Sequence, residues 1–361
     1  MLSNIVRILL PAAVSFAIGI AATPLLTHYL YKFRAWKKRA GKIALDGSAA
    51  DEFNRLHMIN ESRAPRMGGI VVWGSVALAT IVLTMLANYF DNGLIRNVDY
   101  LSRSQTWLPF ATLLVGACIG LIDDLLVIRP NGEGLRLRYR LTFVLLLSFF
   151  VGWWFYDKLE VTAVSIPFYA PLEIGVLIIP LFVTIALALY ASGVIDGIDG
   201  LSGGVFASIF ASYTIIAFAQ NQIDLAAFCS AVVGGLLAFL WFNIPPARFY
   251  MSDTGTMALT LALAVVVFMT DNLGGGVGIA VLPIIGALLF VTVGSIIAQI
   301  LYKQLLGRKL LRIAPLHHHF EAIGWPPYKV VMRYWVLSVV CAALGIILAL
   351  SALQGSILVG A

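Results

Sequence analysis

The chain has 361 residues, of which 60% are hydrophobic and only 12% are charged, and its formal net charge is +6. A soluble globular domain has a clearly smaller apolar share, so this composition excludes water as the main solvent of the chain. The apolar residues form runs that can cross a bilayer core about 30 Å thick, which takes roughly 20 helical residues. We therefore expect an all-α polytopic membrane protein with one membrane-embedded domain over residues 1–361.

Ten apolar runs follow one another along the chain, separated by short polar breaks. They lie at residues 5–31, 67–90, 107–128, 140–157, 173–194, 201–219, 225–243, 256–270, 278–301 and 330–353. Each is read as one membrane-crossing helix, and an even number of crossings leaves both termini on the same side. After the fourth run, the β-branched stretch 159–167 predicts a short hairpin at the outer surface.

The basic residues fall mainly on one side of this arrangement. Of the 24 lysines and arginines, the side with the termini holds only Arg7, Arg96, Arg103 and Lys158. Loops rich in lysine and arginine stay in the cytoplasm, so we expect both termini outside and the basic breaks inside. This orientation accounts for the positive net charge, and no nucleic-acid partner is expected.

An acidic pair marks the cytoplasmic end of the third run. The sequence there is Gly120-Leu-Ile-Asp123-Asp124. A charge at a membrane helix end is costly, and two adjacent carboxylates repel each other unless a metal ion or a proton lies between them. The alternative interpretation is a solvated helix end.

A second acidic segment, Asp196-Gly197-Ile198-Asp199-Gly200, follows the fifth run. Its glycines allow a ligand to approach the backbone closely. The segment also precedes the sixth helix, whose N-terminus favours an anion such as a phosphate. An Asp-Gly turn that caps the helix would explain the same residues without any ligand.

The break after the seventh run combines an amide, an aromatic ring and a carboxylate. These are Asn243, Tyr250 and Asp253, and Asp253 could also serve only as the cap of the eighth helix. The motifs face the same side in a topology that was derived from lysines and arginines alone. This convergence indicates a shared site for a cation or a phosphate.

The last cytoplasmic break carries the triplet His317-His318-His319 in a basic loop. Imidazoles can hold a phosphate or a metal, or exchange protons near neutral pH, and a hydrated surface triplet is the alternative. Magnesium prefers carboxylate oxygens and shares its shell with substrate phosphates, whereas the ligand spacing of a tetrahedral zinc site is not evident. We therefore expect Mg²⁺ and a diphosphate substrate.

Four motifs resemble the polyprenyl-phosphate N-acetylhexosamine-1-phosphate transferase superfamily over almost the whole chain. They are Pro65-Arg66-Met67-Gly68-Gly69, Asp123-Asp124, Asp196-Gly-Ile-Asp199-Gly and Met251-Ser-Asp253-Thr-Gly. The stretch Ala314-Pro-Leu-His-His-His-Phe-Glu321 with Gly324-Trp-Pro resembles the phospho-N-acetylmuramoyl-pentapeptide transferase branch. The resemblance implies a cytoplasmic cleft in the bacterial inner membrane, where phospho-MurNAc-pentapeptide passes from UDP-MurNAc-pentapeptide to undecaprenyl phosphate, giving lipid I and UMP. It also allows a homodimer.

The resemblance further implies roles for single residues. Asp253 and Asp123 would bind magnesium, while Asp123 or Asp124 would engage the metal or deprotonate the lipid phosphate, and His317 completes the catalytic group. The residues implied to bind substrate are Asp196, Gly197, Ile198, Asp199, Asn243, Tyr250, His318 and His319. Among these, the tyrosine holds the position of an aromatic ring that can stack on uracil, and the histidines would bind diphosphate oxygens.

Several positions depart from the family pattern. Arg66 replaces a threonine, Ser252 replaces a glycine, Glu133 stands where a lysine is usual, and Gly193-Val-Ile195 replaces Asn-Leu-Thr. These changes touch nucleotide and phosphate contacts, so transfer of GlcNAc-1-phosphate, or of another UDP-linked amino sugar, stays open. An ion-coupled transporter is the alternative from another class, although transport would favour acids near mid-span.

Overall fold

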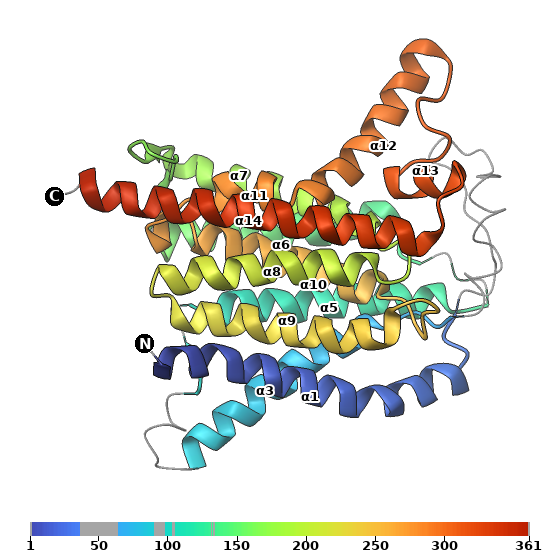
Figure 1. The fold of residues 1–361 in the computed structure, drawn as a ribbon, viewed down its shortest axis with the longest axis horizontal. Coiled ribbons are helices and arrows are strands. Elements are labelled where there is room, and N and C mark those ends of the chain that lie inside the picture. Colours follow the sequence, from blue (N-terminus) through green and yellow to red (C-terminus); the bar gives the residue numbers. More distant parts are fainter. Residues whose placement is uncertain are drawn as a thin grey trace.

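A computed structural model describes residues 2–36, 64–89, 98–102, 105–130, 132 and 134–359. Within these residues, 10 helical segments are long and apolar enough to cross a membrane. They run side by side in one bundle, with the two termini at the same end (Figure 1). The predicted all-α polytopic class is therefore confirmed.

The helices take up most of the described chain. In order they are α1 (Leu2–Lys32), α3 (Gly69–Tyr89), α5 (Trp107–Val127), α6 (Leu137–Asp157), η1 (Gly175–Leu177), α7 (Ile178–Ala191), η2 (Ser192–Ile195), α8 (Leu201–Ala219), α9 (Ile223–Asn243), α10 (Ser252–Met269), η3 (Asn272–Gly274), α11 (Gly278–Ile285), α12 (Ala287–Leu306), α13 (Leu316–Ala322) and α14 (Pro327–Val359). The elements labelled η are short 3-10 helices, and η1 and η2 extend α7 at its two ends.

The ninth predicted segment, 278–301, is interrupted, and the prediction of one continuous helix there was wrong. α11 ends at Ile285 and α12 begins at Ala287. Pro283 inside α11 lacks an N–H group, and its ring opposes the carbonyl of the preceding turn, so the helix is weakened at this point. α12 then leaves the bundle at a steep angle (Figure 1).

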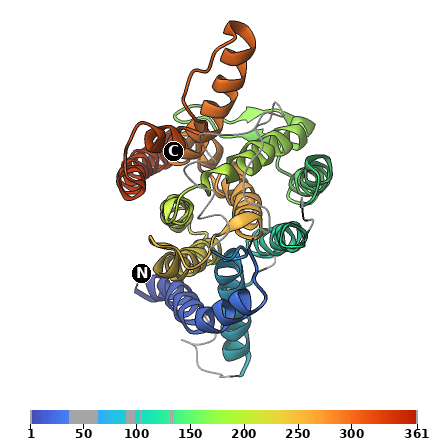
Figure 2. The ribbon, with the colours of Figure 1, turned by 90° about the vertical axis from the view of Figure 1, so that its right-hand side faces the viewer.

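The core of the bundle is built around α10. Every residue from Thr254 to Met269 is buried. α5, α7 and α3 pack directly against it, and Figure 2, a view along the helices, shows it surrounded by its neighbours. At the far end from α13, the ring of Phe268 packs on Phe155 and Phe182, with centroids 5.5 and 4.8 Å away.

Two glycines bring α5 unusually close to α10. A Cβ atom at Gly120 would collide with the carbonyl oxygen of Asp253, and one at Gly116 would lie 2.7 Å from the carbonyl oxygen of Met257. Side chains three and four residues after a helical contact point lie on the same face. The close approach at Gly120 therefore carries the following acidic pair to the start of α10.

A small hairpin covers the opposite end of the bundle. β1 (Ala163–Val164) pairs antiparallel with β2 (Leu172–Glu173). The hairpin predicted from 159–167 is thus present, although its second strand lies beyond that stretch. Asp271, just after α10, anchors the hairpin by accepting a hydrogen bond from the backbone N–H of Ser165 at 2.9 Å.

Candidate active site

Three carboxylates meet at the end of the bundle near α13. Asp123 and Asp124 come from the last turn of α5, and Asp253 comes from the first turn of α10. One oxygen of each lies within 4.8 Å of the others. The first two are buried, whereas the side chain of Asp253 is 28% exposed. Oxygen atoms in this arrangement fit the ligand preference of Mg²⁺, so the cluster could hold such an ion.

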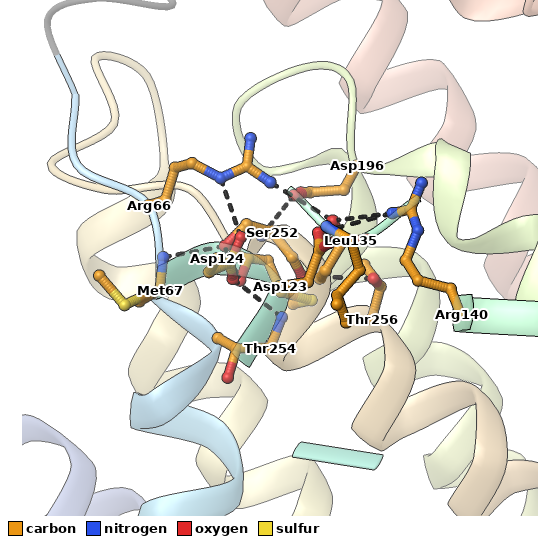
Figure 3. Close-up of polar contacts among 12 residues, drawn as sticks. Arg66, Met67, Asp123, Asp124, Leu135, Arg140, Asp196, Ser252, Thr254 and Thr256 are labelled. Atoms are coloured by element: carbon orange, nitrogen blue, oxygen red, sulfur yellow. Dashed lines mark hydrogen bonds and ion pairs between the residues drawn. The ribbon is translucent and has the colours of Figure 1, made fainter. Parts of the chain in front are cut away.

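Two arginines bridge the carboxylates (Figure 3). Arg66 donates from Nε to Oδ1 of Asp124 at 2.9 Å, and its Nη2 lies 3.5 Å from Oδ2 of Asp253. Arg140 places Nη1 3.5 Å from Oδ2 of Asp123 and 3.4 Å from Oδ2 of Asp253. Burial alone would lower the pKa of Arg66, but the carboxylates outweigh it and raise that pKa, so the guanidinium stays charged. With all five side chains ionised, three negative and two positive charges give −1.

The two members of the acidic pair differ in how they are held. Asp124 accepts hydrogen bonds on Oδ2 from the Ser252 hydroxyl at 2.7 Å and the Thr254 N–H at 3.0 Å, besides its bond from arginine. Asp123 accepts one short backbone bond, from the Leu135 N–H at 2.6 Å. Asp124 is therefore fixed by protein donors on both oxygens, and Asp123 has more capacity left for a ligand.

Ser252 connects three segments at this site. Its hydroxyl accepts a hydrogen bond from the Met67 N–H at 2.8 Å and donates to Asp124, and its own N–H donates to Oδ2 of Asp196 at 2.8 Å. Its φ of 53° is left-handed, which suits glycine better than serine. Asp196 also accepts from the Ser202 hydroxyl at 2.7 Å; burial raises the pKa of its carboxyl, and these hydrogen bonds oppose the rise.

The second acidic segment is fastened to the loop after α9. Asp199 accepts a hydrogen bond on Oδ2 from the Ala247 N–H at 3.0 Å. Asn243 accepts from the Gly200 N–H at 2.8 Å and donates to the carbonyl of Phe249 at 2.8 Å. Because both polar ends of this buried amide contact backbone, Asn243 fixes the shape of the segment.

The loop before α3 is held against the loop before α10 by its backbone. The Tyr250 N–H donates to the carbonyl of Pro65 at 2.9 Å, and the Gly68 N–H donates to the carbonyl of Tyr250 at 2.7 Å. A Cβ atom at Gly68 would also collide with the ring of Phe249. These contacts place Arg66 beside the carboxylates, and they hold the backbone of the predicted aromatic residue, Tyr250, against the same loop.

Two of the three histidines lie beside the second acidic segment. His317 and His318 are buried in α13, and a Cβ atom at Gly197 would lie 2.5 and 2.6 Å from their Nε2 atoms. On the other side of its ring, Nδ1 of His318 lies 2.7 Å from a carboxylate oxygen of Glu321. The structure thus brings this histidine pair to the backbone at Gly197.

The third histidine, His319, is placed differently from the other two. His319 accepts a hydrogen bond on Nδ1 from the Arg312 N–H at 3.1 Å, so it holds the loop before α13.

The sequence indicates Arg140 only as a basic loop residue, because nothing in the sequence shows that the first turn of α6 faces Asp123. Glu133 lies outside the described residues.

The sequence is similar to those of known proteins over most of its length. Residues 106–271, which contain all three carboxylates, match Glycosyl transferase family 4. The phospho-N-acetylmuramoyl-pentapeptide-transferase of Bacillus thuringiensis (strain Al Hakam) is 31% identical over 347 residues, covering 94% of this chain and 97% of the relative. The protein of the same name from Bacillus cereus (strain AH187) gives the same values. The chain therefore belongs to the phospho-N-acetylmuramoyl-pentapeptide-transferase family.

Proposed function

We propose that this chain transfers phospho-MurNAc-pentapeptide from UDP-MurNAc-pentapeptide to undecaprenyl phosphate, which gives lipid I and UMP. The observation that carries the proposal is the likeness, over 94% of the chain, to proteins named for phospho-N-acetylmuramoyl-pentapeptide transfer. The acidic cluster at one end of a membrane bundle supports it. In this proposal that end faces the cytoplasm of a bacterial inner membrane, because it carries basic residues such as Arg66, Arg140 and Arg312.

The donor nucleotide is proposed to bind along the segment Asp196–Asp199, and Tyr250 is proposed to stack on the uracil ring. His317 and His318 border this segment at Gly197, which suits two imidazoles that bind diphosphate oxygens. Asn243 and His319 are proposed to fix the backbone around the donor, because each side chain accepts a hydrogen bond from a backbone N–H group.

The reaction needs an oxygen of the lipid phosphate to attack the sugar-linked phosphorus of the donor. A new phosphorus–oxygen bond forms, the bond from that phosphorus to the bridging oxygen breaks, and UMP leaves. Asp253 and Asp123 are the proposed Mg²⁺ ligands; the bound ion would neutralise diphosphate oxygens and the charge on departing UMP. Asp123 is also better placed than Asp124 to accept a proton from the lipid phosphate. Asp124 accepts three hydrogen bonds, whereas Asp123 accepts one and has only a longer contact, at 3.5 Å, with Arg140.

The deciding experiment is UMP release by the purified protein in detergent with Mg²⁺ and undecaprenyl phosphate. UDP-MurNAc-pentapeptide is compared with UDP-GlcNAc, and each reaction is repeated with EDTA and then with excess Mg²⁺. We expect turnover of the muramoyl donor, loss with EDTA and recovery with Mg²⁺. Turnover of UDP-GlcNAc alone would assign the chain to GlcNAc-1-phosphate transfer. Ion flux in vesicles without turnover of either donor would make it a transporter.

A further inference from the structure

Arg66, in the loop before α3, brings a positive charge into the site. Its Nε and Nη2 face Asp124 and Asp253. A guanidinium has five N–H donors, and among the described residues no further ion pair or hydrogen bond of this group is found beyond these two contacts. The side chain is 25% exposed, and in Figure 3 one terminal nitrogen points away from the carboxylates. Arg66 therefore has donors left for a ligand.

Hydrogen bonds fix the side of the Arg66 guanidinium that faces Asp124. Asp124, which accepts from Nε at 2.9 Å, is itself fixed by the Ser252 hydroxyl at 2.7 Å. The same hydroxyl accepts from the N–H of Met67, the next residue of the chain, at 2.8 Å. The N–H of Arg66 donates to the carbonyl of Ala35 at 2.8 Å. Arg66 and Ser252 thus meet on the carboxylate of Asp124, and these contacts preorganise the arginine.

The charge of Arg66 changes what the loaded site can attract. The three carboxylates with both arginines carry −1, and a divalent cation would bring the site to +1. With an uncharged residue at position 66, the loaded site would be neutral. Both proposed substrates present phosphate oxygens, which the planar fork of a guanidinium binds through two parallel hydrogen bonds. Arg66 would also repel a second cation in the same cluster.

We propose that Arg66 is a phosphate-binding residue of this transferase, which contacts the donor diphosphate through its outer nitrogens while Asp124 and Ser252 hold its inner side. This inference rests on the proposed function. The same positive charge lowers the affinity of the carboxylates for a divalent cation. Compared with a site that has an uncharged residue at position 66, this site therefore binds a diphosphate more tightly and a divalent cation more weakly.

The test measures two affinities of the full-length protein in detergent. UDP binding is followed by calorimetry, and Mn²⁺ binding without nucleotide by electron paramagnetic resonance. The variants are Arg66→Thr and Arg66→Lys. The matched control is Arg138→Gln in α6, because the exposed guanidinium of Arg138 contacts only Tyr139 among the described residues. For Arg66→Thr we expect roughly 10- to 100-fold weaker UDP binding, the size of a lost hydrogen bond to a charged group, and several-fold tighter Mn²⁺ binding. For Arg66→Lys, UDP binding should weaken less and Mn²⁺ binding should stay near wild type.

The outcomes separate this inference from a structural role and from the proposed function. If Arg66 only stabilised the fold, UDP and Mn²⁺ binding would weaken together, and unchanged UDP affinity in Arg66→Thr would overturn the inference outright. If Arg66→Thr elutes as an aggregate, the charge-preserving Arg66→Lys decides, because wild-type UDP affinity there would contradict a fork-type contact. Failure of the wild-type protein to turn over either donor would instead count against the proposed function.

Discussion

The two ends of the bundle both bury carboxylates, but they compensate them with different groups. Near α13, the oxygens of Asp123, Asp124 and Asp253 lie within 4.8 Å of one another and are bridged by arginines. At the opposite end, Asp271 is buried alone and accepts hydrogen bonds from the backbone N–H groups of Ser165 at 2.9 Å and Ile279 at 3.0 Å. No ion pair to Asp271 is found in the part of the chain that the structure describes.

This difference shows which carboxylates belong to the fold and which are available for chemistry. Backbone donors satisfy the hydrogen bonds of Asp271, yet they leave its charge buried, and burial raises the pKa of its carboxyl to about 6. Three carboxylates in one cluster repel one another and need cations. Side-chain cations can shift when a metal or a phosphate arrives, whereas backbone donors cannot. Among the buried carboxylates, exchangeable cation partners therefore distinguish the cluster near α13 from Asp271.

The largest effect is expected from Asp253→Asn, which removes a charge from the reactive end. The side chain is partly exposed and the amide has nearly the same shape, so the fold should persist. We expect UMP release to fall by roughly 100- to 1,000-fold, as for other groups that stabilise charge during reaction. The matched variant at the other end, Asp271→Asn, should keep UMP release near the wild-type rate, because Asp271 lies at the opposite end of α10 from the carboxylate cluster. Equal losses in the two variants would abolish the distinction between the ends.

A second prediction concerns the contact that assembles the cluster. Gly120→Ala places a methyl group against the carbonyl of Asp253 and pushes α5 away from α10. Such overpacking costs about 1–3 kcal/mol of stability, and a displacement near 1 Å can lower activity by about 100-fold. The control is Gly294→Ala in α12, where a methyl group meets nothing within 4 Å. Equal activity in the two variants would show that the α5–α10 approach does not position the acids.

The sequence predicted the parts of this molecule that depend on local pattern. Bilayer thickness sets the length of an apolar run, so ten crossings could be read directly and were confirmed. The positions of Asp123, Asp124 and Asp253 at helix ends on one side were also readable, and the structure brings them together.

The remaining features depend on contacts between distant segments. The bridging geometry of Arg66 and Arg140 arises from loops that meet only in the folded bundle. The amide of Asn243 could be recognised as polar, but its two backbone partners could not be identified. The break between α11 and α12 could not be located from the sequence, because the residues on both sides of Gly286 are apolar.

The buried carboxylate of Asp271 predicts how the stability of the protein depends on pH. Because the folded-state pKa of Asp271 is raised from 3.8 to about 6, the folded protein keeps a proton that the unfolded chain loses between these values. Its contribution to stability is therefore greatest below about pH 4 and falls as the pH rises to about 6, by at most about 3 kcal/mol. Asp271→Asn removes this titration, so its Tm in detergent should vary less across the window. A wild-type slope no steeper than that of the variant would contradict the assignment.

The smallest effect is expected at Ser252, where two variants separate the cost of the left-handed backbone from the gain of the hydroxyl hydrogen bonds. A left-handed residue with a side chain costs about 1–2 kcal/mol relative to glycine, while the hydroxyl bonds to Asp124 and the Met67 N–H offset that cost. Ser252→Ala loses the bonds and keeps the strain, so its Tm should fall below that of Ser252→Gly, which loses both. Both variants should bind UDP several-fold more weakly, because Asp124 then holds Arg66 less firmly. Wild-type UDP affinity in Ser252→Gly would show that the arginine does not need this brace, and equal Tm values for the two variants would show that the left-handed backbone costs nothing here.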